Sequence, residues 1–205
     1  MLFRSLSNSK GFPTNAIFSF TRMLIKFMNE VQPDYAAVAF DAKGPTFRHD
    51  ISDQYKANRP PMPDDMAVQI PYIKKVVTGF NLALLEEPGD EADDILGTLA
   101  VQAVDKGFEV VIVSGDKDFA QLVTDDITIW DPMKEKQVDT AAIIEKYGIQ
   151  PAQMLDVMSL AGDSADNIKG VPGIGEKTAL SLITTFRSLD DLYDQVYFSA
   201  FSTLG

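Results

Sequence analysis

The sequence contains no cysteine and a single histidine among its 205 residues. Disulfides and cysteine-based zinc sites are therefore excluded, and His49 has no second histidine with which to share a metal ion. No apolar run approaches the roughly 18 residues of a membrane span, and the first twelve residues lack the apolar core of a signal peptide. These absences predict a cytoplasmic protein without membrane partners.

Basic residues are also scarce, with 18 Lys and Arg against 30 Asp and Glu and a formal net charge of -12. The imbalance is local: residues 1–75 carry +3, whereas residues 76–205 carry -15. Scattered acids usually form a solvated surface. Several acids here instead follow apolar strands or begin helices, which indicates a gathered acidic site.

Apolar periodicity predicts alternating helices and strands. A helix is expected over residues 17–28 and another over 66–80, kinked or interrupted near its start by Pro71, with a third over 92–103. Residues 35–40, 82–85, 110–113 and 127–130 are expected strands, the first of them buried on both faces. This order predicts an α/β fold with a mostly parallel sheet flanked by helices, and a ligand site beyond the carboxyl ends of its strands.

After residue 150 the pattern becomes helical. One helix is expected to residue 161 and another around 179–186, separated by a segment rich in glycine and aspartate. The glycine-rich part runs from Gly170 to Lys177, where exposed amides at the next helix start could cradle a phosphate. A plain glycine-rich connector is the alternative, but a helix-hairpin-helix that binds the DNA backbone is the favoured interpretation.

Eight carboxylates stand where one cleft could gather them. Each has an ordinary interpretation as a helix-start or turn residue. Uncompensated crowding would raise their pKa values, however, and divalent cations would remove that cost. All-oxygen ligands suit Mg²⁺ or Mn²⁺. The eight are Asp41, Glu91, Asp93, Asp94, Asp116, Asp118, Asp163 and Asp166.

Five blocks of the sequence resemble, in order, the 5′ nuclease domain of bacterial DNA polymerase I and its flap endonuclease relatives. They are Phe40-Asp-Ala-Lys-Gly-Pro-Thr-Phe-Arg48, Tyr55-Lys-Ala-Asn-Arg-Pro-Pro-Met-Pro-Asp64, Glu91-Ala-Asp-Asp94, Gly115-Asp-Lys-Asp118 and the stretch from Gly162 to Ala179. The resemblance runs from about Ser7 to Gln195. It implies a PIN-like α/β domain with a helix-hairpin-helix region after it, and hydrolysis of DNA phosphodiesters in replication and repair.

The resemblance also implies roles for individual residues. The eight carboxylates would hold two or more Mg²⁺ or Mn²⁺ ions, and the helix-hairpin-helix would hold K⁺ through backbone carbonyls. Lys56, Arg59 and Asp116 are the expected catalytic residues, with Lys56 stabilising developing charge. The expected partner is DNA with a 5′ end or flap, and a polymerase domain is an expected fusion partner in the parent gene. The DNA-binding residues would be Arg48, Lys56, Arg59, Lys169, Gly173, Gly175 and Lys177.

Two departures from the family pattern shape the expected domains. The family's first strand, which ends in a metal-binding Asp, has no counterpart in this sequence, and residues 196–205 match nothing in the pattern. We therefore expect a catalytic domain over 1–148 without its first strand, a DNA-binding region over 149–195 and an unmatched tail, and we expect truncation to weaken the activity.

Three alternatives remain open on the sequence. A non-catalytic DNA-binding remnant would keep the glycine-rich hairpin and the basic segment. A phosphatase with Asp-x-Asp after a strand would place Thr or Val where Ala120 stands. A small PIN-type ribonuclease would share the acids but would not carry Gly170 to Lys177.

Overall fold

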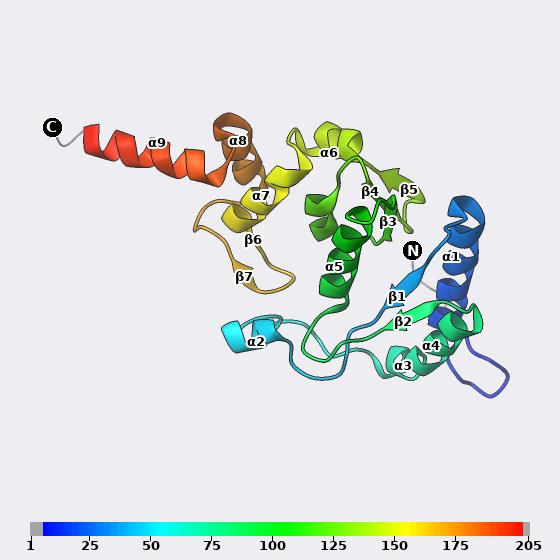
Figure 1. Cartoon of the computed structure of the whole chain (residues 1–205). Helices are drawn as coiled ribbons and strands as arrows, with labels where there is room; N and C mark the ends of the chain where they lie inside the picture. The colour runs from blue at the N-terminus through cyan, green and yellow to red at the C-terminus, as the bar shows by residue number, and fades with distance from the viewer. Residues whose placement is uncertain (1–5, 203–205) are drawn as a thin grey trace. The chain divides into compact units, whose positions relative to one another are not determined.

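The computed structural model describes residues 6–202, and its elements can be followed in Figure 1. The chain forms two compact units, one made of residues 1–47 with 60–95 and the other of residues 48–59 with 96–205. Within the described range no helix is both long and apolar enough to cross a membrane.

The first unit is built on two parallel strands. Ala37 pairs with Ala83 and Ala39 with Leu85, so the strands run in the same direction and end together. Two helices are packed against each other beside them, with Leu24 and Val77 buried in their apolar stripes. The elements of this unit are α1 (Asn15–Val31), β1 (Ala37–Ala39), α3 (Asp64–Ala67), α4 (Ile70–Gly79) and β2 (Ala83–Leu85).

The second unit contains a three-stranded sheet in the order β3-β4-β5. Its first two strands are parallel and the third is antiparallel to them. Ile112, Ile129 and Ile143 lie in one buried cluster that joins the sheet to its helices. Its elements up to residue 147 are β3 (Val110–Val113), η1 (Lys117–Leu122), β4 (Ile127–Asp131), β5 (Lys136–Val138) and α6 (Thr140–Tyr147).

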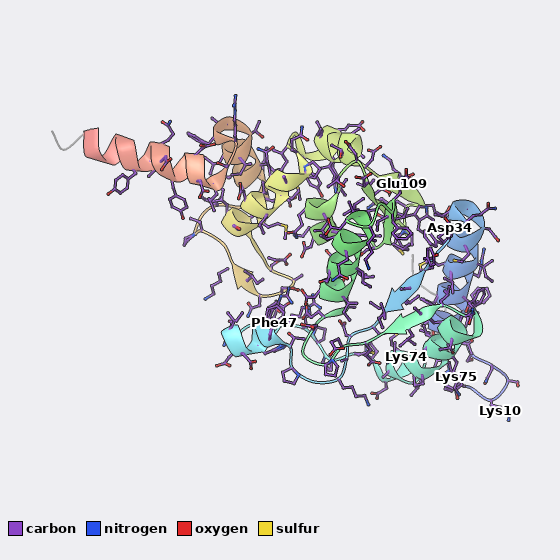
Figure 2. The ribbon with its side chains drawn as sticks, viewed as in Figure 1. Lys10, Asp34, Phe47, Lys74, Lys75 and Glu109 are labelled. Atoms are coloured by element: carbon purple, nitrogen blue, oxygen red, sulfur yellow. The ribbon has the colours of Figure 1, made fainter. Side chains whose placement is uncertain are left out.

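Two further helices lie near the boundaries between the units in the sequence. The helix α5 (Ala92–Val104) begins in the first unit and continues into the second. The short helix α2 (Phe47–Ile51) begins at Phe47, which Figure 2 labels, and opens the 48–59 segment of the second unit.

The remainder of the second unit is helical apart from a two-residue-strand hairpin. That hairpin is closed by glycines: a Cβ on Gly170 would lie 2.3 Å from the carbonyl carbon of Ala161 and 2.4 Å from the amide nitrogen of Gly162. Only a residue without Cβ allows this approach. The elements are η2 (Pro151–Gln153), α7 (Met154–Ala161), β6 (Gly162–Asp163), β7 (Ile168–Lys169), α8 (Glu176–Phe186) and α9 (Leu189–Ser202).

The predicted fold class is confirmed: the chain is α/β, with parallel strand pairs followed by a helical region. The helix expected over 66–80 is interrupted near its start, as predicted: α3 ends at Ala67 and α4 begins at Ile70, with Pro71 in its first turn, where its missing N–H costs no hydrogen bond. Other details were wrong. The strand expected to be buried on both faces is half-exposed in β1. The pattern also missed β5, the β6-β7 hairpin and α9, whose last residues extend into the segment 196–205; residues 203–205 lie outside the described residues.

Candidate active site

The acids of the first unit meet at the start of α5. Asp41 lies just beyond β1, and its Oδ1 accepts a hydrogen bond from the backbone N–H of Ala92 at 2.8 Å. The N–H of Glu91 donates to Oδ2 of Asp94 at 3.1 Å, which closes the first helical turn. Glu91 is buried, with 9% of its surface exposed, whereas Asp93 faces solvent. Carboxylates are stabilised here by the free N–H groups of the helix start.

The acids of the second unit gather around Lys117. Asp116 caps η1, and its Oδ1 accepts from the N–H of Asp118 at 3.0 Å. The i, i+2 spacing of these residues predicts that an extended chain points both carboxylates to one side. That reason was wrong, because a capped helical turn brings the two carboxylates together. Lys117 Nζ lies 3.2 Å from Oδ2 of Asp163. The predicted set of eight carboxylates is thus divided four and four between the two units.

Charge crowding is visible in the pKa values of this second group. Burial raises the pKa of Asp118, and the neighbouring charges of Asp116 and Asp163 raise it further. Burial opposes the charge of Lys117 more than any other single effect, but the hydrogen bond to Asp163 and the nearby negative charges together outweigh it and raise the pKa of Lys117. These shifts record an excess of negative charge that one lysine only partly balances.

The basic segment 54–59 lies against the β6-β7 hairpin. Lys56 Nζ is 3.9 Å from Oδ2 of Asp166, and the guanidinium of Arg59 is paired with Oδ1 of the same residue. Two further contacts tie the segments together: the Asn58 side chain donates to the carbonyl of Ser164 at 2.8 Å, and the backbone N–H of Lys56 donates to the carbonyl of Asp166 at 2.9 Å. The two predicted basic residues therefore share one predicted metal ligand.

The sequence interpretation missed the contributions of Tyr55 and Lys117. Tyr55 is buried, with 6% of its surface exposed, and its hydroxyl donates to Asp166 Oδ2 at 3.0 Å. Both residues lie in motifs whose predicted functional residues are their sequence neighbours: Lys56 beside Tyr55, and the two aspartates that flank Lys117. The available signal for Lys117 was its position between two aspartates; nothing in the local pattern marked the Tyr55 hydroxyl.

The glycine-rich hairpin positions the remaining predicted DNA-binding residues. Gly173 has φ of +83°, a left-handed conformation that favours glycine. Gly175 occupies the N-cap position of α8 and has no side chain, so it offers no side-chain acceptor to the first N–H groups of that helix. Lys169 and Lys177 are exposed, and Arg48 lies half-buried in α2.

The donor chemistry fits a hard divalent cation. All eight predicted ligands are carboxylates, and Asp118 Oδ1 is buried without a hydrogen-bond partner. As they stand, however, no three acidic or histidine side chains between residues 6 and 202 are arranged to hold a metal ion. In the second unit the reason is visible, since the oxygens of Asp163 and Asp166 are bonded to protein donors.

Comparison with solved structures defines the fold class. A bacteriophage T5 5′-exonuclease with bound zinc ions superposes with a TM-score of 0.73 at 23% identity, covering 87% of this chain and 70% of that chain. The catalytic core of Rad2 in complex with a DNA substrate gives a TM-score of 0.58 at 20% identity, covering 98% of this chain and 60% of that chain. The chain thus has the fold of these nucleases.

Sequence comparison then defines the family. The description "5′-3′ exonuclease, N-terminal resolvase-like domain" matches residues 1–148, and "5′-3′ exonuclease, C-terminal SAM fold" matches residues 149–203. The second match runs past Gln195 into the segment that the sequence interpretation left unassigned. The chain belongs to the 5′-3′ exonuclease family.

Two curated relatives illustrate the range of this family. The 5′-3′ exonuclease of Aquifex aeolicus is 42% identical over 187 residues, which are 91% of this chain and 65% of that protein. DNA polymerase I of Bacillus subtilis is 42% identical over 197 residues, which are 93% of this chain and 22% of that protein. The chain therefore spans about a fifth of the polymerase and two thirds of the exonuclease.

Proposed function

We propose that this protein is a metal-dependent 5′-3′ exonuclease and flap endonuclease that hydrolyses phosphodiester bonds of DNA in the cytoplasm. The observation that carries the proposal is the arrangement in the second unit, where the phosphate-binding candidates Lys56 and Arg59 pair with Asp166, one of the acids whose charges act on Asp118. The relatives support it, since the T5 flap endonuclease was solved with DNA and metal ions.

The predicted carboxylate ligands, four in each unit, would hold two or more Mg²⁺ or Mn²⁺ ions. When bound, such ions lower the pKa of a water and stabilise the charge on attacking and leaving oxygens. Asp118 contributes a buried oxygen that has no protein donor to give up. Asp116 holds the turn that places Asp118, through the hydrogen bond to its N–H.

The DNA-binding part would act on phosphates. Lys56 and Arg59 bring positive charge beside the carboxylates, where the scissile phosphate would otherwise be repelled. The N–H groups in the first turn of α8, which begins without a side-chain cap, would offer a second phosphate site together with Lys177, and K⁺ bound by backbone carbonyls belongs to this hairpin in our proposal. We assign catalysis to residues 1–148 and DNA binding to residues 149–195, with a polymerase domain as an expected fusion partner.

The test is cleavage of a 5′-labelled flap duplex by the purified chain with Mg²⁺ and with EDTA. We expect Mg²⁺-dependent release of the labelled 5′ strand, and a loss of at least about tenfold in the Lys56→Ala variant. Lys106→Ala removes an exposed lysine elsewhere and should leave the rate unchanged. DNA binding without cleavage under all conditions would favour the alternative, a non-catalytic DNA-binding remnant.

A further inference from the structure

Asp166 carries more protein contacts than a free metal ligand would. Its Oδ1 pairs with the guanidinium of Arg59, and its Oδ2 accepts from the hydroxyl of Tyr55 and lies 3.9 Å from Lys56 Nζ. Only 17% of the Asp166 side chain is exposed. Both carboxylate oxygens are therefore in use before any metal or DNA is bound.

The same contacts keep Lys56 and Arg59 from acting on a phosphate. A guanidinium bonded to a carboxylate has to leave it before it can bind another anion with the same N–H groups. The Lys56 side chain is 20% exposed and also lies over the ring of Tyr55, 4.9 Å from its centroid. In this state the two cations neutralise Asp166 instead of facing a substrate.

The backbone beneath these side chains is fixed independently of their charges. Lys56 has φ of +53°, in the left-handed region that is unusual for a residue with a Cβ. Its N–H is bonded to the carbonyl of Asp166, and the Asn167 side chain donates to the carbonyl of Gln54 at 2.7 Å. Breaking the ion pairs therefore releases the Lys56 ammonium and the terminal N–H groups of Arg59 while the 54–59 segment stays in place, with Arg59 Nε still 3.2 Å from the carbonyl oxygen of Ala165.

We propose that Asp166 is an exchange point between metal and substrate binding: without metal it holds Lys56 and Arg59, and a divalent cation that takes its carboxylate frees both for phosphate. The inference rests on the proposed function. The exchange makes binding of the divalent cation and of DNA phosphate cooperative, because both require the pairs of Asp166 with Lys56 and Arg59 to be broken. Each ligand therefore raises the affinity for the other by the same factor. Asp166 is then a positioning residue as well as a ligand.

The direct test measures how fast Lys56 is acylated by an amine-reactive reagent, with mass spectrometry of each lysine. Lys74 is the matched control: its side chain is 27% exposed, paired with Glu86 and placed over an aromatic ring, but Glu86 is not a predicted metal ligand. Figure 2 labels Lys74 on α4. We expect Mg²⁺ to raise the Lys56 rate several-fold relative to EDTA and to leave the Lys74 rate unchanged.

The Asp166→Asn variant should show the fast Lys56 rate already in EDTA, with no further response to Mg²⁺. A Lys56 rate that stays constant while Mg²⁺ raises the melting temperature would overturn the exchange and leave the proposed nuclease intact. Failure of the chain to bind any divalent metal would overturn both. The two results are therefore distinguishable.

An independent test measures binding to a flap duplex in EDTA. Asp166→Asn should bind more tightly than wild type by about fivefold or more, the usual range of such couplings. Asp118→Asn removes the same charge nearby without freeing a cation, and should gain less. In an Arg59→Ala background the extra gain of Asp166→Asn should shrink. Equal gains for both Asn variants would show simple charge removal and overturn the exchange.

Discussion

Asp118 places a buried carboxylate oxygen at the centre of the acidic group, and no protein donor satisfies it. Burial and the neighbouring charges raise its pKa, so the folded, metal-free protein carries this charge at a cost. Its acidic partners differ: both oxygens of Asp163 accept hydrogen bonds, and the resulting stabilisation outweighs burial and lowers the pKa of Asp163. The unsatisfied residue is the one that gains most from a cation.

We expect Asp118→Asn to stabilise the metal-free protein by up to about 1 kcal/mol at pH 7, because the amide removes a half-buried charge that Lys117 only partly balances and solvent partly screens. A raised pKa in the folded state means that stability from this group falls as pH rises. The advantage of the variant should therefore shrink as pH drops toward 3.8, the ordinary pKa of Asp. Urea denaturation in EDTA across this range is the measurement. A variant less stable than wild type at pH 7 would contradict the argument.

Gly170 tests a different kind of residue-level constraint. A Cβ there meets backbone atoms of Leu160, Ala161 and Gly162 at 2.4 Å or less, so Gly170→Ala should cost at least about 1–3 kcal/mol in free energy of unfolding. Gly79→Ala is the control, since a Cβ there meets nothing within 4 Å and alanine favours the helix. Guanidinium denaturation compares the two variants. Equal stabilities would show that the hairpin adjusts freely.

At the scale of elements, α1 receives its N-terminal cap from a residue far along the chain. Thr14 at the N-cap position makes no side-chain cap bond. Instead Gln69, with 1% of its surface exposed, accepts from the N–H groups of Ala16 at 2.9 Å and Ile17 at 3.3 Å. Its amide nitrogen donates to Oδ1 of Asn15 at 3.1 Å. The one buried side-chain amide of Gln69 therefore accepts from two N–H groups of the first helical turn and also donates to a side chain there.

Gln69→Leu should destabilise the protein by about 1–3 kcal/mol, because two partly buried helix-start N–H groups would lose their acceptor. Gln102→Leu makes the same chemical change on an exposed position of α5 and should alter stability by less than about 0.5 kcal/mol. Thermal or urea unfolding measures both. If Gln69→Leu is as stable as Gln102→Leu, the cap contributes nothing.

The same scale explains which elements the sequence could predict. Apolar periodicity located α1, α5, α8 and β3, because each buries one stripe or one run of its own residues. The cap from Gln69 and the pairing of Lys56 with the Asp166 carboxylate depend on contacts between residues more than fifty positions apart, which no local pattern records. Asp116 and Asp118 were correctly paired for the wrong reason, since i, i+2 spacing also occurs in a capped turn.

At the scale of the whole molecule, a net charge of -12 has to be reconciled with the polyanionic substrate that we propose. Like charges gathered by the fold destabilise it, and ions that bind only the folded state reverse that effect by mass action. Divalent metals should therefore act on stability as well as on catalysis.

We expect Mg²⁺ at about 100 times its dissociation constant to stabilise the protein by about 2.7 kcal/mol, seen as a higher melting temperature. The double variant Asp116→Asn with Asp118→Asn should lose most of that shift. Asp125→Asn with Asp126→Asn removes two exposed charges from the same unit and should keep it. A full shift in the first double variant would mean that these acids are not ligands.

The DNA binding that we propose for so acidic a molecule must depend on a few local phosphate contacts, because charges beyond a Debye length of about 10 Å are screened at 0.1 M salt. Lys177, exposed in the first turn of α8, is one such contact in our proposal. Lys177→Ala should therefore weaken binding by the same factor for duplexes of different sequence, and should reduce the slope of log affinity against log salt by about 0.9. Lys136→Ala on β5 is the control for simple loss of charge and should leave the slope unchanged.

Fluorescence anisotropy over a salt series measures both slopes. A loss that depended on DNA sequence would place Lys177 at a base edge and contradict backbone recognition by this hairpin.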